Sequence, residues 1–158
     1  MRIIDGHNVI GAAEAFGLAL SQSDKEERLL RLLSSYRSRR RRREPTLVVF
    51  DGHHGRLAVG PRRYSHAGIE VEWAVGESAD AVIVRRVKSA PRPGEIEVVT
   101  SDQALLSSVT GWGAKGTRSP AFLDRIAEAM AEEPAPEKPE APSQTEVAEW
   151  LERFDREK

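Results

Sequence analysis

The sequence predicts an α/β domain built on a mainly parallel sheet, and two apolar runs carry the prediction. Ile3-Ile4 and the run 46–50 (Thr-Leu-Val-Val-Phe) are short, rich in β-branched residues and typical of buried strands. Between them, residues 25–40 repeat leucine at helical spacing. Two strands buried on both faces and joined by such a helix form a βαβ unit, which implies parallel strands.

The elements around this unit follow from local signals. The first strand ends at Asp5-Gly6, a turn-forming pair that predicts a loop. Ser23 or Asp24 is expected to cap the helix 25–40, which Pro45 separates from the second strand. The stretch 53–67 lacks periodicity and is predicted to be an exposed loop.

The second half of the chain continues the alternation. Residues 69–73 alternate apolar and polar, which predicts a half-exposed strand toward an edge of the sheet. Ser78 is a predicted N-cap for a helix through Val87. Strands are expected at 95–100 and within 111–116, and Ser119-Pro120 is typical of the start of a last helix.

Composition divides the chain into three parts. Residues 1–131 are predicted to form the folded domain, with 20 basic and 16 acidic residues. Residues 132–144 are rich in Pro, Ala and Glu, which is typical of a linker, and 145–158 have the pattern of an amphipathic helix. These last 27 residues hold 4 basic and 9 acidic residues, so a mildly basic domain precedes an acidic tail.

The totals exclude several classes of site. The chain has 158 residues and no cysteine, which excludes disulfides, thiolate zinc sites and cysteine nucleophiles. No signal peptide or membrane span is recognisable, so we expect a cytoplasmic protein.

Four aspartates are predicted to meet at one edge of the sheet. Asp5 and Asp51 end the first two strands, Asp80 begins the helix after the third strand, and Asp102 follows the fourth. Carboxylates gathered in this way repel one another unless a multivalent cation lies among them. Oxygen ligands alone favour Mg²⁺ or Mn²⁺. Taken singly, each aspartate has an ordinary alternative role in a turn or as a helix cap.

Four motifs resemble the NYN-domain branch of the PIN-like nucleases, and most closely the bacterial YacP-like group. They are Ile4-Asp5-Gly6-His7-Asn8, Val49-Phe50-Asp51, Glu77-Ser78-Ala79-Asp80 and Val99-Thr100-Ser101-Asp102, in the family's order and spacing over about residues 1–130. His7 departs from the family pattern, which has tyrosine at this position.

The resemblance implies a PIN-like, Rossmann-like three-layer α/β/α sandwich with a sheet of about five strands. It also implies metal-dependent cleavage of RNA. By that analogy the catalytic, metal-holding residues are Asp5, Asp51, Asp80 and Asp102, supported by Asn8. Ser101 would bind a phosphate or a water, and Glu77 is a weaker candidate ligand. Messenger RNA and the ribosome are the partners that the resemblance suggests.

A run of arginines is the main candidate for RNA binding. It comprises Arg39, Arg40, Arg41, Arg42 and Arg43, and Arg56, Arg62 and Arg63 are expected to extend it. Five consecutive cations exceed what a helix end needs, which favours phosphate binding. The alternative is a solvated helix terminus whose charge the helix dipole stabilises.

These residues suggest three candidate functions. The first is a Mg²⁺- or Mn²⁺-dependent endoribonuclease acting on single-stranded RNA. The second is a non-catalytic RNA-binding module with the same fold. A phosphatase on a similar sheet is disfavoured, because such enzymes need Asp-x-Asp on the first strand and His7 occupies the second position.

Overall fold

The structure is a computed structural model that describes residues 1–15, 24–52 and 62–132. Arg56, Ser23 and most of the predicted acidic tail lie outside the described residues. The expectations of a linker up to residue 144 and of a helix over 145–158 therefore stay predictions.

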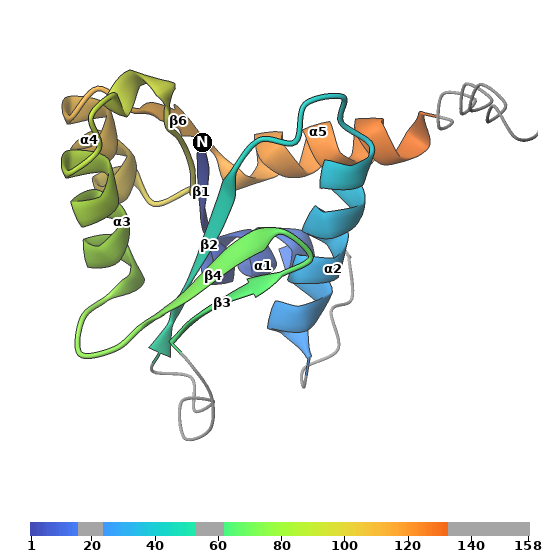
Figure 1. Cartoon of the computed structure of the whole chain (residues 1–158), viewed down its shortest axis with the longest axis horizontal. Coiled ribbons are helices and arrows are strands. Elements are labelled where there is room, and N and C mark those ends of the chain that lie inside the picture. Colours follow the sequence, from blue (N-terminus) through green and yellow to red (C-terminus); the bar gives the residue numbers. More distant parts are fainter. Residues whose placement is uncertain (16–23, 53–61, 133–158) are drawn as a thin grey trace, which may run out of the picture.

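The described residues form a six-stranded sheet in the order β3-β4-β2-β1-β5-β6 (Figure 1). The strands are β1 (Arg2–Asp5), β2 (Thr46–Asp51), β3 (Arg63–His66), β4 (Ile69–Ala74), β5 (Glu97–Val99) and β6 (Lys115–Thr117). Only the pairing of β3 with β4 is antiparallel in this sheet. This confirms the α/β prediction, with one strand more than the expected five.

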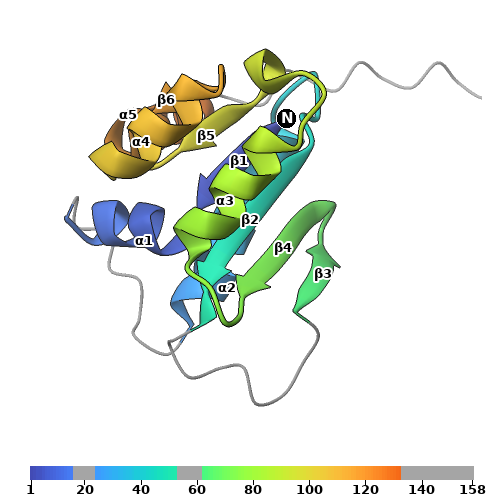
Figure 2. The ribbon, with the colours of Figure 1, turned by 90° about the vertical axis from the view of Figure 1, so that its left-hand side faces the viewer.

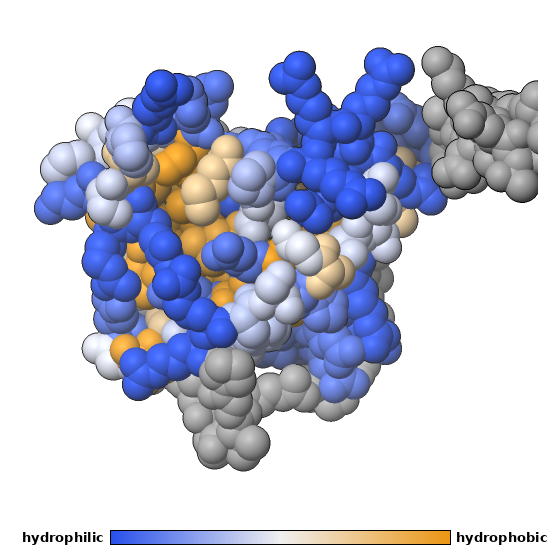
Figure 3. All heavy atoms as spheres, viewed as in Figure 1, coloured by the Kyte–Doolittle hydropathy of each residue, from blue (hydrophilic) through white to orange (hydrophobic). Residues whose placement is uncertain are grey.

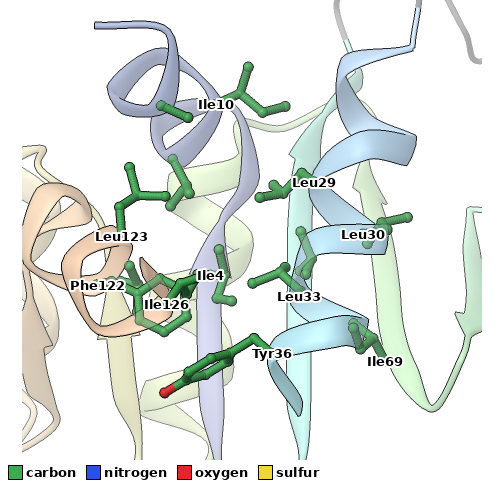
Figure 4. Close-up of a cluster of buried hydrophobic side chains, with 14 of the residues drawn as sticks. Ile4, Ile10, Leu29, Leu30, Leu33, Tyr36, Ile69, Phe122, Leu123 and Ile126 are labelled. Carbon is green, nitrogen blue, oxygen red and sulfur yellow. The ribbon is translucent and has the colours of Figure 1, made fainter. Parts of the chain in front are cut away.

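Helices cover both faces of the sheet, which gives the three expected layers (Figure 2). They are α1 (Gly6–Ala15), α2 (Lys25–Ser38), α3 (Ala79–Lys88), α4 (Gln103–Gly111) and α5 (Ser119–Ala131). One core holds Ile4 and Val48 with α1, α2 and α5 (Figure 4). The other holds Ile3 and Val49 with α3 and α4. Neighbouring strand residues thus enter opposite cores, as the two-residue period of a strand requires.

The prediction of a loop over 53–67 is wrong for residues 63–66, which form the edge strand β3. Its side chains are exposed or half-exposed and show no alternation of apolar and polar residues, so no local pattern indicates a strand there. The strand forms by antiparallel pairing with β4 through the two-residue turn Ala67-Gly68. Both turn residues have positive φ, 49° and 77°, as tight hairpin turns require.

The loop expected after Asp5 is also absent, because α1 begins directly at Gly6. A Cβ atom placed at Gly6 would overlap the ring of Phe50 on β2. Glycine here serves the close approach of helix and sheet, and not a turn.

The remaining elements lie near their predicted positions, but the strand predicted within 111–116 is shifted: residues 111–113 end α4 and form a turn, and β6 covers Lys115–Thr117. Ser78 caps α3, and its hydroxyl accepts a hydrogen bond from the Ala81 N–H at 3.1 Å. The strand predicted over 95–100 narrows to β5 because a 3₁₀ turn, η2 (Pro93–Glu95), precedes it. None of the helices in the described ranges is long and apolar enough to cross a bilayer.

Candidate active site

The four predicted aspartates all lie at the edge where the parallel strands end. Asp5 comes two residues after Ile3, and Asp51 comes two residues after Val49, so both face the side covered by α3 and α4. Asp80 lies in the first turn of α3 and Asp102 is the N-cap of α4. The topology therefore brings strand ends and helix starts to one edge, as predicted.

Asp5 is the buried member of this group, with 7% of its surface exposed. Its Oδ2 accepts a hydrogen bond from the Thr100 hydroxyl at 3.0 Å, and Thr100 in turn accepts the Asp102 N–H at 3.2 Å. Burial raises the pKa of Asp5 from 3.8 to about 6, against the lowering effect of Thr100 and of the Asn8 N–H. The charges of Asp80 and Asp102 raise this pKa further.

Asp80 is part of the same electrostatic group. Its pKa is raised first by burial and then by the negative charges of Asp102 and Asp51. The repulsion therefore links all four carboxylates, two from strands and two from helix starts. Such mutual repulsion is typical of a site that receives a cation or a proton.

The donor chemistry of this group fits a hard divalent cation, since every candidate ligand is a carboxylate oxygen. The carboxylates are not gathered as a ready metal site, because no three Asp, Glu or His side chains in the described ranges are arranged to hold an ion. Asp5 commits one oxygen to Thr100, and Asp102 commits Oδ1 to the Leu105 N–H at 3.0 Å as a helix cap. The capping role considered for Asp102 is thus present beside its place in the cluster.

Asn8 and Ser101 connect the strands' edge to α5. The Asn8 Oδ1 accepts hydrogen bonds from the Ser101 N–H at 2.9 Å and from the Ser119 hydroxyl at 2.7 Å. The Ser101 hydroxyl accepts the Ser119 N–H at 3.2 Å. These bonds hold the segment after β5, which carries Thr100 and Asp102, against the start of α1.

His7, the departure from the family pattern, supports Asp51. Its Nδ1 accepts a hydrogen bond from the Asp51 N–H at 3.1 Å, so Nε2 carries the proton and donates to Glu26 Oε1 at 3.2 Å. The ring packs against Phe50 and Trp73, with centroids 5.2 and 6.2 Å away. His7 therefore joins α1, α2 and the end of β2.

The other predicted site residues do not form one site with the aspartates. Glu77 forms an ion pair with Arg85 at 2.5 Å, and this pairing lowers the pKa of Glu77. Arg62 and Arg63 lie at the start of β3, and Arg63 is paired in register with Glu72 near the end of β4. The run 39–43 lies before β2, at the opposite edge of the sheet from the aspartates (Figure 1). The structure thus does not join the arginines into one track.

Sequence reasoning missed the residues that support the carboxylates. Thr100 is fully buried, and a polar residue at the end of an otherwise apolar strand was the available signal. The role of His7 had no such signal, because it depends on a bond to Asp51, 44 positions away. The buried Ser119 was predicted only as the start of a helix.

Comparisons with known proteins agree with this architecture. Two crystal structures of Rae1 (YacP) from Bacillus subtilis share the fold. A mutant form is 22% identical with a TM-score of 0.64, covering 82% of this chain and 76% of that one. The other is 21% identical with a TM-score of 0.65, covering 99% and 82%. No curated protein gives a match. The model of the YacP-like NYN domain matches residues 2–158, so the chain belongs to the YacP-like NYN family.

Proposed function

We propose that this protein is a divalent-metal-dependent ribonuclease that cleaves single-stranded RNA internally at the aspartate edge. The observation that carries the proposal is the buried Asp5, whose pKa of about 6 is raised by burial and by the charges of Asp80 and Asp102. A fold gains no stability from burying a carboxylate among carboxylates. Such an arrangement is typical of a catalytic site.

Mg²⁺ or Mn²⁺ would be held by Asp5, Asp51, Asp80 and Asp102. When bound, the ion lowers the pKa of a coordinated water and offsets the charge of the phosphodiester. The protein's own part is positioning. Thr100 holds the Asp5 carboxylate by a 3.0 Å hydrogen bond, and His7 holds the backbone of Asp51.

The proposed substrate is RNA because membership of the NYN family indicates a nuclease that acts on RNA. The edge strand β3 supports this, since its first residues Arg63 and Tyr64, and Arg62 just before it, are exposed near the ends of β2 and β4. Arginines bind phosphates, and an exposed aromatic ring offers a stacking surface for an unpaired base.

Messenger RNA in a ribosome-associated decay context is the finer part of the proposal, and it rests on the family resemblance. Co-sedimentation of the protein with ribosomes in a sucrose gradient tests this part separately. A protein that cleaves RNA but stays at the top of the gradient would limit the proposal to free RNA.

The enzymatic part is tested with a labelled single-stranded RNA, incubated with the purified full-length protein and with Mg²⁺, Mn²⁺ or EDTA. We expect internal cleavage with either metal, none with EDTA, and none for Asp5→Asn. Asp124→Asn, on the exposed face of α5, is the matched control and should cleave normally. RNA binding without cleavage under every condition would replace the proposal with a non-catalytic RNA-binding module.

A further inference from the structure

A basic cavity lies at the opposite end of the sheet from the aspartates. A cavity of about 440 Å³ opens where α2 ends and β1 and β2 begin. It is lined by five arginines, Arg2, Arg37, Arg40, Arg42 and Arg43, which we call the arginine cradle. Hydrophilic side chains project at the upper edge of the molecule, where the loop between α2 and β2 lies (Figure 3).

Among the residues that the structure describes, acidic groups compensate little of the charge of the cradle. Glu44 is the acidic residue in its lining, and it is engaged by the terminal amine at 3.3 Å and by Arg2 at 3.1 Å. Arg2 also bonds Glu97 at 2.8 Å, so its own charge is matched. Within the described ranges, the side chains of the other four cradle arginines have no hydrogen-bond or ion-pair partner.

The cradle is held in place by contacts that do not use its donors. The Arg40 guanidinium lies over the Tyr36 ring, 5.7 Å from its centroid, and Tyr36 itself is buried. The Arg37 guanidinium lies so close to the β3–β4 turn that a Cβ at Gly68 would be 2.5 Å from its Nη1. These contacts fix the positions of both guanidinium groups without pairing their charges.

Arg37 provides the most specific signal. Its Nε is buried and has no hydrogen-bond partner among the described residues. A buried charged donor without a partner is costly, and a bound anion relieves that cost. Arg40, Arg42 and Arg43 are exposed, as a solvated helix end also requires, so the buried Nε of Arg37 is the observation that favours an anion site.

We propose that the arginine cradle is a phosphate-binding site, and that it anchors the backbone of an RNA strand away from the aspartate cluster. Several guanidinium groups around one hollow match the oxygens of a phosphate, which arginine binds through paired donors. The assignment of the phosphate to RNA rests on the proposed function. The binding of phosphate by the cradle is independent of that function.

The cradle and the aspartate cluster lie at opposite ends of the same strands. Thr46 lines the cradle and Asp51 ends the same strand, five residues later, which corresponds to roughly 16 Å of extended chain. A phosphate in the cradle is therefore an anchor for the strand and lies far from the proposed cleavage chemistry.

The first test titrates inorganic phosphate into the full-length protein in metal-free buffer. The readout is the ¹⁵N–¹H resonance of the Arg37 Nε, assigned with Arg37→Lys. We expect a saturable shift of this resonance, while that of Arg85, which is paired with Glu77, stays in place. An Arg37 resonance that does not respond to phosphate would overturn the site.

The second test uses two charge-matched double variants from the same run. Arg42 and Arg43 line the cradle, whereas Arg39 and Arg41 do not. We expect Arg42→Gln with Arg43→Gln to weaken phosphate binding about tenfold. Arg39→Gln with Arg41→Gln should weaken it by less than about twofold at physiological salt. Equal losses would indicate a diffuse basic surface and contradict a built site.

The third test identifies the source of the phosphate with a labelled single-stranded RNA in EDTA, where no cleavage occurs. RNA should displace phosphate from Arg37. The Arg42→Gln and Arg43→Gln double variant should lower the salt slope of RNA binding by about 1.4, for two lost contacts. Phosphate that RNA does not displace would overturn the RNA assignment. If the nuclease proposal fails, the cleavage assay will show no cleavage while the cradle still binds RNA.

Discussion

Replacing Asp5 with Asn should stabilise the metal-free protein while abolishing cleavage. The ionised carboxylate is buried, and its pKa is raised from 3.8 to about 6. A difference of roughly two units corresponds to about 3 kcal/mol of unfavourable free energy in the folded state at pH 8. Asn is close in shape to the carboxylic acid and is uncharged, so it should recover most of this amount.

The sign of the pH dependence follows from the direction of the shift. Because the folded-state pKa of Asp5 is raised, the cost is present in full above pH 6 and absent below the unfolded value of 3.8. The advantage of Asp5→Asn should therefore fall to about half at pH 5 and nearly vanish at pH 4. A lost structural contact would give a penalty with no such profile.

The measurement is urea unfolding of both proteins in metal-free buffer at pH 8, 5 and 4, with Asp124→Asn as the surface control. We expect the control to differ from the parent by less than about 0.5 kcal/mol at each pH. An Asp5→Asn protein that is less stable than the parent at pH 8 would refute the reasoning. It would mean that Asp5 is a structural residue and not a strained functional one.

Three further substitutions test the network around Asp5. Asp80→Asn removes one of the charges that raise the pKa of Asp5, so that pKa should fall in a carboxyl NMR titration; an unchanged value would contradict the coupling. Thr100→Val removes the hydrogen bond that lowers the same pKa, so the titration should move upward, and urea unfolding should show a loss of about 1–2 kcal/mol. His7→Phe leaves the Asp51 N–H without its acceptor and should lower kcat more than it raises KM in the RNA assay; a change in KM alone would argue against positioning. Adding Mg²⁺ should raise the Tm of the parent and leave that of Asp80→Asn nearly unchanged, as measured by calorimetry.

The positions of the aspartates could be predicted because they depend on topology alone. Once Ile3-Ile4 and 46–50 are parallel strands, the residues that follow them meet at one edge. The helix starts carrying Asp80 and Asp102 reach the same edge, because each helix returns the chain from one strand end to the next strand start.

The supporting contacts could not be predicted, because they join residues far apart in the chain. The Thr100 hydroxyl bonds Asp5 across 95 positions, and Ser119 bonds Asn8 across 111. The strand β3 was missed for a related reason, since only pairing with β4 makes its polar residues a strand. A local sequence pattern does not indicate either kind of contact.

The winding of the sheet also explains why acidic and basic residues gather at opposite edges. In a parallel sheet, connecting helices run against the strands, so their N-termini lie at the carboxyl edge and their C-termini at the amino edge. The partial positive charges at the starts of α3 and α4 favour Asp80 and Asp102 there. The partial negative charge at the end of α2 favours the arginines that follow it. The helix dipoles thus stabilise each cluster at its own edge, and an RNA strand that contacted both clusters, as we propose, would have to cross the domain.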